Sequence, residues 1–275
     1  ASYIADPWGE RRRATYLWIP VWILVAVAVV SFVALREGVI CILLLAPLWL
    51  ISGIAGSALT YFVRHRLKRG RTYCAALLVA PLVAMQLEPL VTLPDAQLVV
   101  SRTVVVDASP EKIWPLLRGI PDVLPGEGKW NVTQDVIGVP RPLGARLIGN
   151  GIGADRFAHW AHGLRFRERI TQWSQDRHIG WRFIFERADG WYYTDRHLVP
   201  DSLYFRIEEG GYSLEPMNSG RTRLTLRTQY WIQTPLNFYC AWWGELFLGD
   251  LSDNLLALVK NRAEHTSLGR DSKLI

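Results

Sequence analysis

Three long apolar runs within the first hundred residues constrain this chain most strongly. They are Thr15–Leu35, Gly38–Val63 and Thr72–Leu93. About 20 apolar residues in a helix cross a hydrocarbon core of roughly 30 Å. The first two runs meet that requirement, whereas the third spans only if its helix continues through Glu88. We therefore expect residues 1–94 to form a membrane domain of three transmembrane helices.

Basic residues are distributed unevenly around these runs. Arg11–Arg13 precede the first run, and five basic residues lie within 64–71, between the second and third runs. Basic loops favour the cytoplasmic side of a membrane. Three spans then carry the C-terminal part to the opposite side. We expect a bacterial inner-membrane protein with a cytoplasmic N-terminus and a periplasmic C-terminal domain.

Composition excludes several classes of protein. Hydrophobic residues make up 50% of the chain and charged residues 20%, which excludes intrinsic disorder and a simple cytosolic enzyme. Residues 102–275 hold 22 Lys+Arg against 20 Asp+Glu, so this part is nearly neutral and we expect no nucleic-acid partner. Cys41, Cys74 and Cys240 lie far apart, which predicts neither a disulfide framework nor a metal site.

The residues after Pro94 follow the period of two that is typical of strands. Ser101–Val106 predicts a first strand, and Ser109 followed by Pro110 predicts the start of a helix, with room for one short helix after it. Further strands are expected at Asn131–Gly138, Ala145–Asn150, Leu164–Trp173, His178–Glu186, Leu203–Leu214 and Arg221–Ile232. From Pro235 to about Ala263, apolar residues recur every three or four positions, which predicts one long amphipathic helix.

Several of these segments carry a family resemblance. VVVDASPEKIWPLL (104–117), RFRERITQW (165–173), GWRFIF (180–185) and GRTRLTLRTQYW (220–231), with the terminal helix, resemble the START-like or helix-grip superfamily, also called SRPBCC or polyketide cyclase/dehydrase-like. The chain is also similar to an uncharacterised bacterial subgroup in which membrane spans precede such a domain.

This resemblance implies an α+β fold over 95–266, with a tail at 267–275. The expected domain is a curved seven-stranded antiparallel sheet around a long C-terminal helix, because that arrangement buries both apolar faces. Members share no fixed catalytic set. The resemblance therefore implies a cavity for an apolar ligand between sheet and helix, and no particular reaction.

Glu168 is the main candidate for a ligand-binding residue. It alternates along its strand with Arg165, Arg167 and Arg169, and three arginines cannot all face a core, so Leu164, Phe166, Glu168, Ile170 and Gln172 are expected to point inward. A carboxylate there needs a partner or a proton. The alternative for Glu168 is a structural ion pair with Arg156 or Arg182.

Aromatic residues complete the predicted ligand-binding set. With Glu168, they are Phe166, Trp181, Phe183, Phe185, Phe205, Tyr230 and Trp243. We predict no catalytic residue, metal ligand or cofactor, because His159 and His162 lack a second ligand cluster and Gly149–Gly153 is not followed by a helix. Trp191–Tyr193 is expected at a membrane or partner surface.

Three functional hypotheses remain open. The first is a membrane-anchored periplasmic carrier or sensor of a hydrophobic small molecule, such as a lipid, an isoprenoid or a quinone-like compound. The second is an accessory or assembly subunit of a larger membrane complex, with Gly53, Gly56 and Ser57 allowing close contact with helices of other membrane proteins. The third is a cyclase-like or hydrolytic enzyme that uses Glu168 with His159, His162 or His197. The bilayer and an apolar ligand are the expected partners.

Overall fold

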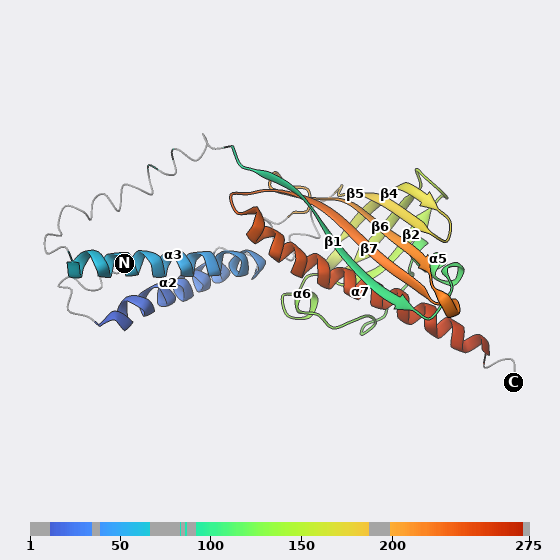
Figure 1. Cartoon of the computed structure of the whole chain (residues 1–275), viewed down its shortest axis with the longest axis horizontal. Coiled ribbons are helices and arrows are strands. Elements are labelled where there is room, and N and C mark those ends of the chain that lie inside the picture. Colours follow the sequence, from blue (N-terminus) through green and yellow to red (C-terminus); the bar gives the residue numbers. More distant parts are fainter. Residues whose placement is uncertain are drawn as a thin grey trace. The chain divides into compact units, whose positions relative to one another are not determined.

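The computed structural model separates the chain into two compact units, Ala1–Leu93 and Pro94–Ile275 (Figure 1). It describes residues 12–34, 39–66, 83, 86, 92–186 and 199–271. The predicted loop Trp191–Tyr193 lies outside these residues.

The first unit contains two long apolar helices, α2 (Arg13–Val33) and α3 (Val39–Arg66). Within them, Ala14–Val33 and Val39–Phe62 have the length and composition that a membrane span requires. The helices coincide with the first two predicted runs. Most of the third predicted run, Thr72–Leu93, lies outside the described residues.

Small residues bring α2 and α3 close together. A side chain at Gly53 of α3 would place its Cβ 2.9 Å from the Cβ of Pro20 on α2. Ser57 is buried, whereas Gly56 has open space in front of it. The surface predicted to contact other membrane proteins is therefore used, at Gly53, for contact within the chain.

The second unit is built on a seven-stranded antiparallel sheet with the strand order β1-β7-β6-β5-β4-β3-β2. The strands are β1 (Asp95–Val106), β2 (Pro142–Ile148), β3 (Asp155–Trp160), β4 (Arg165–Ser174), β5 (His178–Ile184), β6 (Phe205–Pro216) and β7 (Thr222–Gln233). Figure 1 shows α7 (Asn237–Asp271) running along the curved sheet. The predicted α+β helix-grip arrangement is confirmed.

A short helix stands where the sequence predicted a strand. The prediction for Asn131–Gly138 is wrong, because Val132–Asp135 forms the single turn of α6. The side chain of Asn131 accepts a hydrogen bond from the backbone N–H of Gln134 at 2.8 Å and caps this turn. The seventh strand is instead β3, which the sequence analysis missed.

A bulge in β4 reverses the alternation near its end. The pairing with β5 shifts register between Ile170 and Gln172. An extra residue in one strand exchanges the faces of the residues after it. Gln172, predicted to point inward, is exposed, and Trp173 packs edge-on against Trp114 with ring centroids 5.1 Å apart.

The main core lies between the sheet, α7 and the helix α5 (Pro110–Arg118). The predicted helix start at Pro110 is confirmed, and α5 buries Ile113, Trp114 and Leu117. The terminal helix α7 continues to Asp271, beyond the predicted end near Ala263. These elements leave part of the space between sheet and helix unfilled.

Candidate functional site

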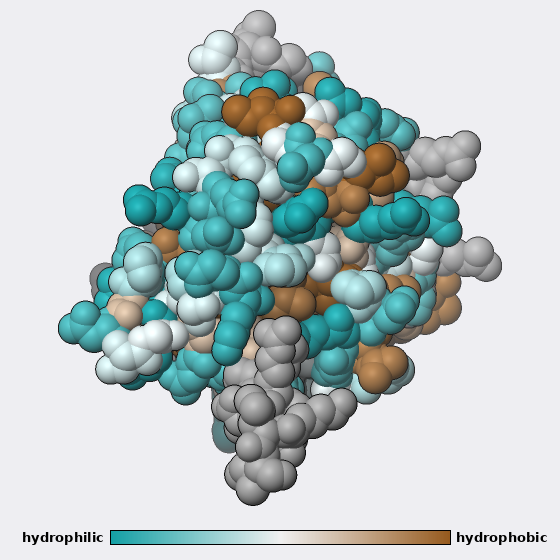
Figure 2. Space-filling view, turned by 90° about the vertical axis from the view of Figure 1, so that its right-hand side faces the viewer, coloured by the Kyte–Doolittle hydropathy of each residue, from teal (hydrophilic) through white to brown (hydrophobic). Residues whose placement is uncertain are grey.

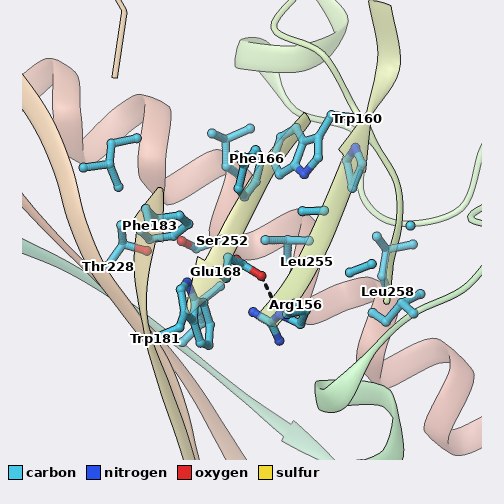
Figure 3. Close-up of a pocket in the computed structure, with 18 of the residues that line it drawn as sticks. Arg156, Trp160, Phe166, Glu168, Trp181, Phe183, Thr228, Ser252, Leu255 and Leu258 are labelled. Carbon is cyan, nitrogen blue, oxygen red and sulfur yellow. Dashed lines mark hydrogen bonds and ion pairs between the residues drawn. The ribbon is translucent and has the colours of Figure 1, made fainter. Parts of the chain in front are cut away.

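A cavity of about 120 Å³ lies between the sheet and α7 (Figure 3). Its wall is mostly apolar. Strands β2 to β7 supply one side, and α7 supplies the other through Leu248, Leu251, Ser252, Leu255 and Leu258. Each of these α7 positions lies three or four residues from another of them, so they share one face of the helix.

The cavity brings together five of the eight predicted ligand-binding residues. Glu168, Phe166, Trp181, Phe183 and Phe185 line it. Their role in binding stays a prediction.

The other three predicted residues lie outside this lining. Phe205 and Tyr230 pack on each other in a second, smaller core cluster, with ring centroids 6.0 Å apart. Trp243 contacts Tyr239, Trp242 and Phe247 along α7.

Four aromatic rings form one continuous wall of the cavity. Phe166 lies 5.9 Å from Phe183 and 5.6 Å from Phe185, between ring centroids, and Phe183 stacks on Phe185. Trp160 extends the wall, with its centroid 5.9 Å from that of Phe166. Sequence reasoning missed Trp160 because it missed β3, whose alternation of Arg156, Ala158 and Trp160 is the signal that could have found it.

The buried charges in the cavity wall form one ion pair. Arg156 on β3 and Glu168 on β4 are register partners, and the Arg156 Nε donates to the Glu168 carboxylate. Their side chains are only 6% and 7% exposed. The guanidinium also donates to the Leu117 carbonyl and lies 4.1 Å from the centroid of the Trp181 ring.

This arrangement decides between the partners considered for Glu168. Arg182, the other candidate, pairs with Glu209 at 3.7 Å instead. Burial disfavours the charged form of Arg156, but the charge and hydrogen bond of Glu168 outweigh it and raise the pKa of Arg156. Arg156 therefore keeps its charge, and its ion pair with Glu168 adds no net charge to the cavity wall.

Three further polar groups belong to the lining. Thr228 on β7 and Ser252 on α7 contribute hydroxyl groups beside Phe183 and Glu168 in Figure 3. The buried Nε1 of Trp181 has no hydrogen-bond partner among the described residues. Neither Thr228 nor Ser252 was singled out from the sequence, and the spacing of Ser252 from Leu248 and Leu255 on α7 was the available signal for it.

The lining offers no histidine for acid–base chemistry with Glu168. His159 is exposed and borders a different, open groove, and His197 lies outside the described residues. Burial raises the pKa of Tyr212 to about 12, so its phenol stays protonated near neutral pH. The described residues contain no cluster of three or more histidines, cysteines or carboxylates that could hold a metal ion.

Comparisons with known proteins found similarity only at the level of solved structures. No protein-family model and no curated protein matches the sequence. The chain is similar to a START superfamily protein from Mycobacterium smegmatis, with a TM-score of 0.40 and 15% identity over 61% of this chain and 98% of that one.

Two enzymes are also among the similar structures. Zhui aromatase/cyclase from Streptomyces sp. R1128 has a TM-score of 0.39 and 15% identity over 62% of this chain and 96% of that one. Truncated norcoclaurine synthase from Thalictrum flavum has a TM-score of 0.38 and 16% identity over 64% of this chain and 99% of that one. Likeness at this level supports no statement about a substrate or a reaction of this chain.

Proposed function

We propose that this protein is a membrane-anchored binder of a small, neutral, mainly apolar molecule. The observation that carries the proposal is the mostly apolar cavity between the sheet and α7. The apolar helices α2 and α3 support an anchor in the bilayer, where such molecules partition. The basic residues around the apolar runs support a periplasmic location for the second unit.

The volume of the cavity limits the ligand. An apolar protein cavity of about 150 Å³ holds a molecule of the size of benzene. A cavity of about 120 Å³ therefore suits one ring or one short branched unit. Among the ligands expected from the sequence, we favour the ring of a quinone-like compound or one isoprenoid unit, with any longer tail outside the cavity.

The polar groups of the wall refine this ligand class. Arg156 and Glu168 neutralise each other, so a charged ligand gains no counter-charge there. The hydroxyl groups of Thr228 and Ser252 and the N–H of Trp181 can each donate a hydrogen bond. A ring with one or two carbonyl or hydroxyl oxygens satisfies them, which favours a quinone-like ring over a plain hydrocarbon.

Ligand retention tests this proposal. The chain is purified from membranes in mild detergent, and its bound small molecules are identified by mass spectrometry. We expect one apolar molecule per chain in the natural protein and loss of it in Leu255→Trp, which fills the cavity. Leu246→Trp is the matched control, because Leu246 lies on the same helix, is exposed and does not line the cavity.

Two results would contradict the proposal. One is a natural protein that retains no apolar molecule and also fails to bind an added one-ring quinone. The other is equal ligand content in Leu255→Trp and the natural protein, which places the ligand elsewhere.

A further inference from the structure

The starts of β1, β6 and α7 and the end of β7 lie together at one end of the second unit. We call it the proximal end and define it by residues 94–97, 201–206 and 231–242. Asp95 at the start of β1 pairs with Gln233 at the end of β7, and Phe205 at the start of β6 pairs with Ile232. Asn237, the first residue of α7, donates from Nδ2 to the Pro94 carbonyl at 2.8 Å. The proximal end is therefore where the chain arriving from the first unit joins the sheet.

Large apolar side chains are exposed at this end. Leu203 is 81% exposed and Tyr204 58%, just before β6. Phe238 is 77% exposed and Trp242 69%, and they lie one turn apart on the same side of α7. Backbone bonding connects these segments, since Gln233 N–H donates to the Tyr204 carbonyl at 3.0 Å. A group of exposed aromatic and aliphatic residues of this kind marks an interaction surface.

The chemistry of the proximal end matches a membrane interface. The guanidinium of the exposed Arg206 lies 3.9 Å from the centroid of the Trp231 ring, and Trp231 Nε1 donates to the Asp95 carboxylate at 3.2 Å. Tryptophan, tyrosine and arginine combine an apolar body with a polar group, which is why they concentrate at lipid headgroups.

The opposite end has a different surface. Figure 2 looks onto the side of the second unit where β1 ends and α7 finishes in Figure 1. This face is mainly hydrophilic, and its hydrophobic colour is confined to small areas. The contrast gives the second unit one end suited to lipid and one end suited to water.

We propose that the proximal end lies in the headgroup region of a lipid bilayer, with Leu203, Phe238 and Trp242 reaching the acyl boundary. This inference rests on the proposed membrane anchor, because Pro94 directly follows the unit that contains α2 and α3. We choose a bilayer as the partner of this surface because the proposed membrane anchor directly precedes it along the chain.

This placement also positions the cavity. β4 begins at Arg165 and β5 ends at Ile184, and their register places both termini toward the proximal end. The aromatic wall formed by Trp160, Phe166, Phe183 and Phe185 stands at these termini. The aromatic wall of the cavity therefore lies toward the proximal end, which the proposal places at the bilayer.

Depth-dependent quenching tests the proposal on the full chain. Cys41, Cys74 and Cys240 are replaced by serine, and an environment-sensitive dye is attached at Phe238→Cys or, as the matched control, at Ile152→Cys. Ile152 is also highly exposed but lies in the turn from β2 to β3, at the opposite end. Both proteins are placed in vesicles of phosphatidylcholine and phosphatidylglycerol that contain spin-labelled lipid. Circular dichroism verifies that both are folded.

We expect the dye at residue 238 to be quenched severalfold more strongly than the dye at residue 152. Equal quenching at the two positions would overturn the proposal, and it is also the outcome expected if the proximal end binds a partner protein. Alkaline carbonate washing separates this failure from failure of the membrane anchor. A chain that washes off the vesicles contradicts the proposed function, whereas a retained chain with an unquenched dye at 238 contradicts only the placement of the proximal end.

Discussion

Arg156 and Glu168 form a buried ion pair across the adjacent strands β3 and β4, in the wall of the cavity. Removal of one partner from a buried pair leaves an uncompensated charge and destabilises a protein by about 3–5 kcal/mol. We therefore expect Glu168→Leu to lower the free energy of unfolding strongly. The double variant Arg156→Leu/Glu168→Leu should recover most of that loss, since it leaves no charge behind. Chemical unfolding followed by tryptophan fluorescence measures both. A Glu168→Leu variant as stable as the natural protein would mean that the pair is not buried.

Gly244 permits the closest approach of α7 to Tyr230. A side chain at Gly244 would place its Cβ 2.3 Å from the Tyr230 hydroxyl oxygen and 2.7 Å from Cζ of the same ring, so it would overlap the rigid phenol. Overpacking of this kind destabilises by about 1–3 kcal/mol, so Gly244→Ala should lower the melting temperature in spite of the better helix propensity of alanine. Gly249→Ala is the control, because its nearest neighbour is the flexible end of Arg102. An equal effect of the two substitutions would show that the contact with Tyr230 is not the cause.

Stability should fall as the pH is lowered, in two ranges. Burial lowers the pKa of His178 below its ordinary 6.5, so the unfolded state takes up a proton first and stability declines below about that pH. Hydrogen bonds from Arg169 to Asp155 and from Arg262 to Glu127 lower the pKa of those carboxyl groups below 3.8 and 4.5. Their contribution is present above those values and is lost as the pH falls further.

The variant His178→Asn separates the two ranges. We expect it to remove the decline that begins near pH 6.5 and to keep the decline that begins below pH 4.5. Melting temperatures of the natural protein and the variant, measured from pH 8 to pH 3, provide the comparison. Parallel curves for the two proteins would exclude His178 as the source of the upper step.

The number of membrane spans decides the side on which the second unit lies. With three spans, a membrane-impermeant maleimide should label Arg146→Cys in intact spheroplasts, because Arg146 is exposed on β2. Ser2→Cys should react only after lysis. Both variants are made in a chain whose native cysteines are replaced by serine. Labelling of Arg146→Cys only after lysis would place the second unit in the cytoplasm and contradict a third span at Thr72–Leu93.

Periodicity along the sequence was sufficient for the regular elements. The alternation in Arg165–Trp173 placed Glu168 inward, and the recurrence of leucines after Pro235 located α7, because each pattern reflects one local geometry. The strand prediction from alternation failed at Asn131–Gly138. Apolar and polar residues alternate there, but the side chain of Asn131 caps a helical turn. The prediction from alternation failed again at Thr171, where a bulge reverses the faces of Gln172 and Trp173.

The apolar runs, the sheet with its terminal helix and the burial of Glu168 were determined by the sequence itself, since each depends on the order of apolar and polar residues within one segment. Only the tertiary structure decided that Arg156 is the partner of Glu168 and that Trp160, Thr228 and Ser252 meet around one cavity. These relations join β3, β4, β7 and α7, and strand register and helix rotation, which no single segment encodes, bring their side chains together.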